Sequence, residues 1–83
     1  MKVQVTQDDI IKGVRGDSCF CPIARAVSRR FPGKKIKVEY NYVSVGHGKW
    51  YLMAKEGKDF VQNFDCFGPR FVKPIEFDMM ESN

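Results

Sequence analysis

The sequence contains four side chains that could bind a metal ion: Cys19, Cys21, Cys66 and the only histidine, His47. Thiolate and imidazole groups are the usual protein ligands of zinc. Zinc sites commonly use Cys-x-x-Cys or His-x-x-x-His spacing, whereas Cys19 and Cys21 are separated by one residue and the other two side chains stand alone. The spacing therefore predicts no metal site and no cofactor.

Cys21 could instead be a reactive thiol. It directly precedes Pro22, and because proline is favoured at the first position of a helix, Cys21 is predicted to be the helix N-cap. The positive end of the helix dipole favours a thiolate there. Nucleophilic catalysis also needs a base, and the one histidine lies in a Gly-His-Gly segment where nothing in the sequence orients it. We favour the alternative, that Cys21 and Cys66 are small apolar residues buried at helix ends, and we predict no catalytic residue and no enzyme.

The spacing of apolar residues predicts the elements that must position these side chains. Alternation predicts strands over residues 2–5, 36–40, 42–45, 49–52 and 72–79, with a turn or bulge near Asn41 and a turn at Gly46-His47-Gly48. Helical spacing and end signals predict a short helix that Thr6 caps and Gly13 ends in the left-handed conformation, a helix from Pro22 to about Phe31, and a helix over about 54–66.

These elements predict an α+β fold. The most economical arrangement is a single two-layer domain over residues 1–83, with two longer helices and one short helix packed on one face of a mostly antiparallel sheet. The residues predicted to lie in the core from the helical pattern are Phe20, Ile23, Val27, Phe60 and Phe64.

One segment of the chain is strongly basic and is the candidate binding surface. The cations concerned are Arg25, Arg29, Arg30, Lys34, Lys35 and Lys37, and Tyr42 and Trp50 follow on the next strands. Such a surface could dock phosphates, with the aromatic rings stacking on bases, or it could dock a protein partner. It could equally be a solvated face with ordinary cross-strand packing beside it.

The composition is that of a folded protein: 83 residues, of which 43% are hydrophobic and 29% charged, with a formal net charge of +4. The chain has no apolar run of about 18 residues and no apolar signal-peptide core near its start. The odd number of cysteines argues against a disulfide framework. We expect a protein of a reducing cytoplasm, without a membrane partner or a small-molecule substrate.

Three stretches carry a resemblance over most of the chain: VTQDDIIKGVRG, CPIARAV and FVQNFDCFGPRFVKPIEFDM. In this order they resemble a group of short proteins encoded by tailed bacteriophages. One departure is that the glycine expected soon after Phe64-Asp65 comes one residue late, at Gly68. The group has no assigned activity, so the resemblance implies no catalytic residue, although its pattern includes Cys21.

The resemblance implies a phage accessory protein that acts in the cytoplasm of a host bacterium. With the small size and the lack of a catalytic constellation, it predicts a non-enzymatic factor that binds a host protein, for host takeover or against host defence. The alternative is a nucleic-acid-binding accessory protein that uses the basic surface between Arg25 and Lys37.

Overall fold

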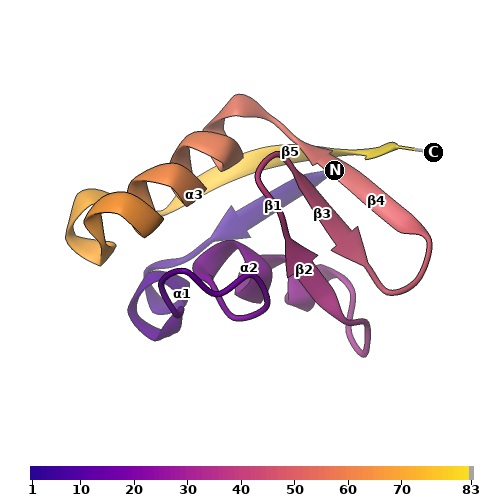
Figure 1. Ribbon diagram of the computed structural model, residues 1–83, viewed down its shortest axis with the longest axis horizontal. Coiled ribbons are helices and arrows are strands. Elements are labelled where there is room, and N and C mark those ends of the chain that lie inside the picture. Colours follow the sequence, from indigo (N-terminus) through magenta and orange to yellow (C-terminus); the bar gives the residue numbers. More distant parts are fainter. Residues whose placement is uncertain (83) are drawn as a thin grey trace.

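The computed structural model describes residues 1–82 and contains five strands, three α-helices and one short 3-10 helix (Figure 1). In chain order these are β1 (Lys2–Val5), α1 (Gln7–Lys12), α2 (Pro22–Arg30), β2 (Ile36–Val38), β3 (Tyr42–Val45), β4 (Lys49–Met53), α3 (Lys55–Phe67), η1 (Pro69–Phe71) and β5 (Ile75–Ser82). The strands form one antiparallel sheet in the order β1-β5-β4-β3-β2. The predicted α+β class is confirmed.

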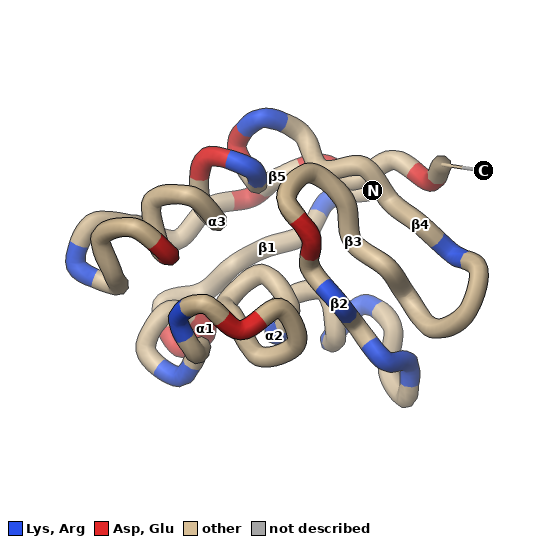
Figure 2. Tube along the Cα trace, viewed as in Figure 1, with Lys and Arg blue, Asp and Glu red and all other residues tan. Residues whose placement is uncertain are grey.

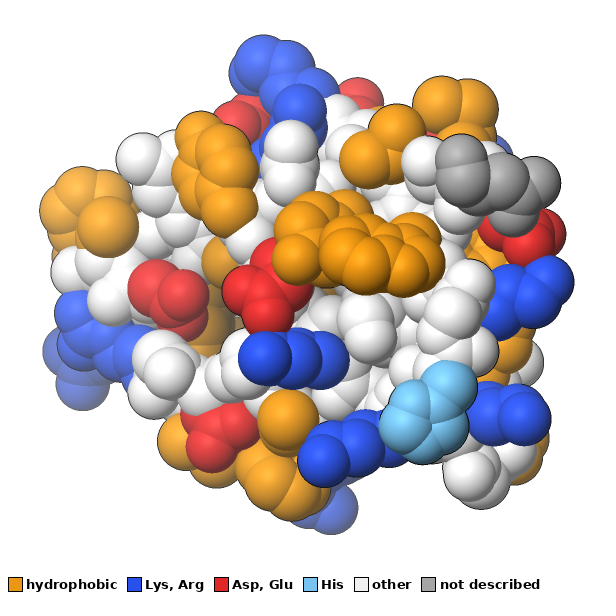
Figure 3. Space-filling view, turned by 45° about the vertical axis from the view of Figure 1, so that its right-hand side comes forward, with side chains coloured by type: hydrophobic (Ala, Val, Ile, Leu, Met, Phe, Trp, Pro, Cys, Tyr) orange, Lys and Arg blue, Asp and Glu red, His pale blue; other side chains and the backbone are white. Residues whose placement is uncertain are grey.

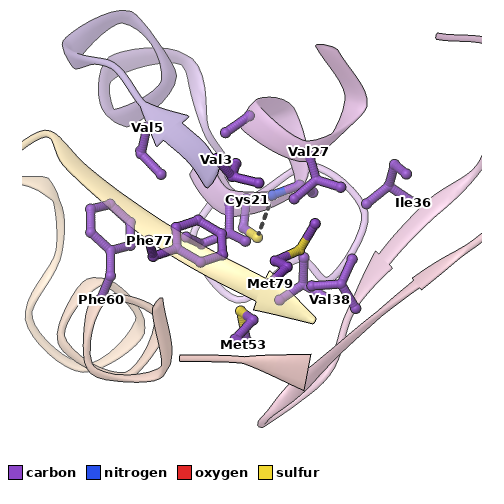
Figure 4. Packing of buried hydrophobic residues seen from close by; sticks show 14 of the residues in the cluster. Val3, Val5, Cys21, Val27, Ile36, Val38, Met53, Phe60, Phe77 and Met79 are labelled. Carbon is purple, nitrogen blue, oxygen red and sulfur yellow. Dashed lines mark hydrogen bonds between the residues drawn. The ribbon is translucent and has the colours of Figure 1, made fainter. Parts of the chain in front are cut away.

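One face of the sheet forms the core with the helices. Because side chains alternate between the two faces of a strand, the residues on this face come from every second position of each strand. Helix α2 packs against β1 and β2, α3 packs against β5 and β4, and α1 packs against α2. Figure 4 shows side chains from both layers meeting in the core, among them Val3, Val27, Phe60, Phe77 and Met79.

The starts of α1 and α2 agree with the sequence signals. Thr6 caps α1 through a capping box: its hydroxyl accepts a hydrogen bond from the N–H of Asp9, and the Asp9 carboxylate accepts one from the N–H of Thr6. Pro22 is the first residue of α2, and Cys21 is its N-cap, whose Sγ accepts a hydrogen bond from the N–H of Ala24 at 3.4 Å. The prediction that Cys21 begins a helix is confirmed.

Gly13 does not adopt the left-handed conformation that we predicted. Its φ is −68° and its ψ is 149°, an extended conformation that any residue can adopt. A Cβ atom at this position would lie 2.5 Å from Cδ of Pro22. Glycine is therefore needed there because α1 ends against the first residue of α2, and not because of backbone strain.

Phe20, which we predicted to lie in the core, is exposed, and so is Tyr40, which the predicted strand over 36–40 places on the same face as Ile36 and Val38. Phe20 precedes the first residue of α2, so its orientation does not follow the helical period, and it is 63% exposed. Tyr40 lies beyond the end of β2, in a turn that the hydrogen bond from Glu39 N–H to the Tyr42 carbonyl closes, and it is 75% exposed. The other core predictions, Ile23, Val27, Phe60 and Phe64, are confirmed.

Candidate functional site

The environment of Cys21 does not activate its thiol. Its side chain lies among the core residues (Figure 4), and burial raises its pKa, while backbone N–H groups of Ala24 and Ile23 only partly oppose that rise. A thiol of this kind stays protonated at neutral pH. The interpretation of Cys21 as a buried apolar residue is therefore confirmed, but the same prediction for Cys66 is wrong, because Cys66 is exposed on the last turn of α3.

No metal-binding cluster of three or more Cys, His, Asp or Glu side chains is found in residues 1–82. Over the same residues, no helix is long and apolar enough to cross a membrane.

Two of the six predicted surface cations, Arg25 and Arg29, are engaged within the fold. Asp9 is completely buried, and Arg29 donates to both of its carboxylate oxygens at 2.6 Å. Arg29 also donates to the Gln4 carbonyl of β1. Nε of Arg25 lies 3.4 Å from Asp9, and its guanidinium reaches Asp8 at 3.5 Å. Arg25 and Arg29 therefore join α1, α2 and β1, so the candidate surface is smaller than predicted.

Of the other predicted cations, Lys34 and Lys35 lie at one end of the sheet, whereas Arg30 lies beside β1, in a separate hollow that Lys2 and Glu76 also line. Within the described residues, Arg30, Lys34 and Lys35 form no ion pair. Lys34, Lys35 and His47 line a hollow of about 440 Å³ between the segment before β2 and the β3–β4 turn. Figure 2 shows the lysines clustered at that segment, and Figure 3 shows cationic side chains on both sides of the single histidine.

The second face of the sheet carries no helix and presents an apolar group of side chains. We call Tyr42, Trp50, Leu52 and Met80 the open-face patch. Strand register places Tyr42 opposite Leu52 and Leu52 opposite Met80, on three adjacent strands. The rings of Tyr42 and Trp50 have centroids 4.6 Å apart, and Trp50, Leu52 and Met80 are 47%, 44% and 66% exposed. Figure 3 shows hydrophobic side chains gathered at the centre of one face of the molecule.

Leu52 and Met80 were not among the predicted site residues, although the sequence contained a signal for them. Each alternates with neighbours that now lie in or against the core: Met53 follows Leu52, and Met79 precedes Met80. A strand that is apolar on both faces is typical of a sheet with both faces covered. Here nothing in the described chain covers the second face.

The charges beside the open-face patch are paired rather than free. Lys37 lies 3.3 Å from Glu39, and Lys2 lies 3.1 Å from Asp78. Strand parity puts Lys2, Lys37 and Asp78 on the same face as the patch. The patch therefore has a nearly neutral border, and Lys37 is not a free cation as its place in the basic stretch had suggested.

No family model, curated protein or solved structure matches this chain in the comparisons.

Proposed function

We propose that this chain is a non-enzymatic accessory protein of a tailed bacteriophage that binds a host protein in the bacterial cytoplasm. Its role is to redirect a host process or to block a host defence. The three resembling stretches support the phage origin. The buried thiol of Cys21 supports a role without nucleophilic catalysis.

The open-face patch is the observation that carries the binding proposal. Aromatic residues and methionine are enriched at the centres of protein interfaces, and apolar patches rimmed by polar groups commonly mark such sites. A nucleic-acid surface needs unpaired cations next to its aromatic rings. Here the lysines nearest to the patch, Lys2 and Lys37, already have carboxylate partners. The chemistry of the patch therefore favours a protein over a nucleic acid.

The experiment is a pull-down from bacterial lysate, with and without nuclease treatment, using wild-type protein and two variants and read out by mass spectrometry. Leu52→Glu places a charge in the open-face patch, whereas Phe71→Glu makes the same kind of change at an exposed apolar residue on η1. We expect one stoichiometric partner that Leu52→Glu loses and Phe71→Glu retains. A partner retained by both variants, or one that nuclease removes, would contradict the proposal.

Nucleic acid remains the second candidate because of the unpaired cations Arg30, Lys34 and Lys35. Lys34 and Lys35 lie at one end of the sheet, and no carboxylate lines the hollow beside them. In the same pull-down, this function predicts partners that disappear with nuclease and that do not depend on Leu52.

A further inference from the structure

A cleft separates α3 from the loop that leads into α2. Its volume is about 340 Å³, within the range of pockets that hold a ligand group. Three parts of the chain line it: the loop at 16–18 with Cys21, the end of β2 with the turn after it, and one side of α3. We call this the α3 cleft.

The floor of the α3 cleft is apolar. Cys21 and Val38 are each 6% exposed, and Val61 is half-buried on α3. The ring of Tyr40 stands at the edge and is mostly exposed. The exposure of Tyr40, which the strand pattern did not predict, is therefore what makes its ring available to a ligand. An aliphatic chain entering the cleft would lie against carbon and sulfur atoms on more than one side.

Hydrogen bonds fix the walls of the α3 cleft. Arg15 donates to the carbonyls of Asp65 and Cys66 at 2.7 Å each, and the N–H of Gly16 donates to Oδ1 of Asp65 at 3.1 Å. On the other side, the N–H of Val38 donates to the Ser18 carbonyl at 2.8 Å. The loop is thus tied to both α3 and β2, so the cleft is formed before a ligand arrives.

The rim of the α3 cleft is acidic. Its charged lining residues are three carboxylates, Asp17, Glu39 and Asp65, and one ammonium, Lys58. Oδ1 of Asp17 accepts from two backbone N–H groups and Oδ1 of Asp65 accepts from one. No hydrogen bond or ion pair within residues 1–82 engages the Oδ2 atom of Asp17 or Asp65. The third carboxylate, Glu39, forms an ion pair with Lys37.

We propose that the α3 cleft receives an arginine side chain of the protein partner. This inference rests on the proposed function and names a feature that the partner must have. The aliphatic part of arginine matches the apolar floor, and its planar guanidinium can donate to two carboxylates and stack on an aromatic ring such as Tyr40. Lysine, with a compact and strongly hydrated ammonium, fits this arrangement less well.

The test uses isolated protein and a small probe, so it does not depend on finding the host partner. Arginine blocked at both ends as N-acetyl-arginine amide is titrated while backbone amide signals are followed by NMR. We expect saturable, millimolar binding, as for a fragment of this size, with shifts confined to residues 16–18, 38–40 and 58–66. Blocked citrulline, which has the same shape without the charge, should bind at least about tenfold more weakly.

A pair of variants tests the carboxylates. In Asp17→Asn/Asp65→Asn the amide oxygens can still accept the backbone hydrogen bonds of the loop, so the walls persist while two charges are lost. We expect affinity for blocked arginine to fall about tenfold or more. The control Asp59→Asn/Glu76→Gln removes two exposed carboxylates outside the cleft and should leave binding unchanged.

Equal binding of arginine and citrulline, or equal loss in both double variants, would overturn the inference. So would the absence of any saturable shift at the cleft. These outcomes are independent of the pull-down: a host partner lost with Leu52→Glu would uphold the proposed function even if the α3 cleft bound no arginine.

Discussion

Arg29 was predicted from the sequence to be a surface cation, but its role in the fold is structural. It lies on α2 with half of its side chain exposed, yet its guanidinium holds the fully buried carboxylate of Asp9 at two points. Burial by itself would raise the pKa of Asp9, but the hydrogen bonds from Arg29 and from the Thr6 N–H outweigh burial and lower it. Asp9 is thus ionised in the fold and depends on Arg29.

Replacing Arg29 should therefore destabilise the protein. Arg29→Ala leaves a buried carboxylate with one strong partner fewer, and we expect a loss of about 2–3 kcal/mol in the free energy of unfolding. This is less than for a fully buried pair, because water reaches the exposed side of Arg29. Arg30→Ala is the matched control, since Arg30 is exposed and unpaired in the described chain, and should change stability by no more than about 0.5 kcal/mol.

The same prediction has a pH dependence. Because the folded pKa of Asp9 is lowered, its contribution to stability is fully present above the unfolded value of about 3.9 and is lost as the pH falls through the folded pKa. The gap between wild type and Arg29→Ala should therefore shrink in acid. Urea unfolding at a series of pH values measures it, and a gap that stayed constant or widened below about pH 4 would contradict this account.

At the scale of elements, α3 contains a glycine that packing requires. Gly57 lies inside the helix, where alanine would ordinarily gain about 1 kcal/mol. A Cβ atom there would lie 2.9 Å from Cδ2 of Phe77, which is 1% exposed on β5 and is packed in the core. The helix approaches the sheet closely at this point because residue 57 has no side chain.

We expect Gly57→Ala to destabilise the protein by about 1–3 kcal/mol, the usual cost of overpacking a core, in spite of its better helix propensity. Thermal or urea unfolding measures this, with Lys58→Ala, the next residue of the same helix, as the control for a change in propensity alone. A Gly57→Ala variant more stable than wild type would show that α3 and β5 can separate enough to admit a methyl group.

The sequence predicted the five strands and three α-helices in their order, because the apolar period changes from two to nearly four wherever a strand gives way to a helix, but it did not predict η1. It erred where position depends on tertiary contacts. Phe20 fits the helical period, but α2 begins only at Pro22. We predicted a left-handed conformation for Gly13. The residue is instead constrained by its contact with Pro22, nine residues later in the chain.

The sequence predicted only part of the candidate site, and the reason is related. Tyr42 and Trp50 do lie on the same face of the sheet, as strand alternation allows, but no local pattern says which face the helices cover. Charge clustering in the sequence did not reveal ion pairs formed by distant residues: Arg29 pairs with Asp9, 20 positions earlier. The α3 cleft joins segments from three parts of the chain and had no signature at all.

For the molecule as a whole, the open-face patch and the unpaired cations form surfaces of different kinds. The open-face patch is apolar with paired charges, whereas the unpaired cations lie elsewhere: Lys34 and Lys35 at the end of the sheet, and Arg30 beside β1. The unpaired cations that contribute to the net charge of +4 therefore lie away from the aromatic rings of the patch. We therefore expect any association with nucleic acid to depend on these unpaired cations and not on the patch.

This separation predicts weak, salt-sensitive nucleic-acid binding. Each phosphate contact to a duplex contributes about 0.9 to the slope of log affinity against log salt, so three cations give a slope of no more than about 3. We expect affinity weaker than micromolar at about 0.15 M salt for duplex DNA, single-stranded DNA and RNA. Lys34→Glu/Lys35→Glu should remove about two phosphate contacts and lower the slope by their contribution.

Leu52→Glu is the control for that titration, because it alters the patch and leaves the sheet end intact. If the two surfaces are independent, the salt slope of Leu52→Glu should match that of wild type. In the pull-down, Lys34→Glu/Lys35→Glu should retain the partner that Leu52→Glu loses. Micromolar or tighter binding of RNA or single-stranded DNA that is lost in Leu52→Glu or Trp50→Ala would instead mean that bases stack on the open-face patch. Nucleic acid would then be the better assignment for the protein.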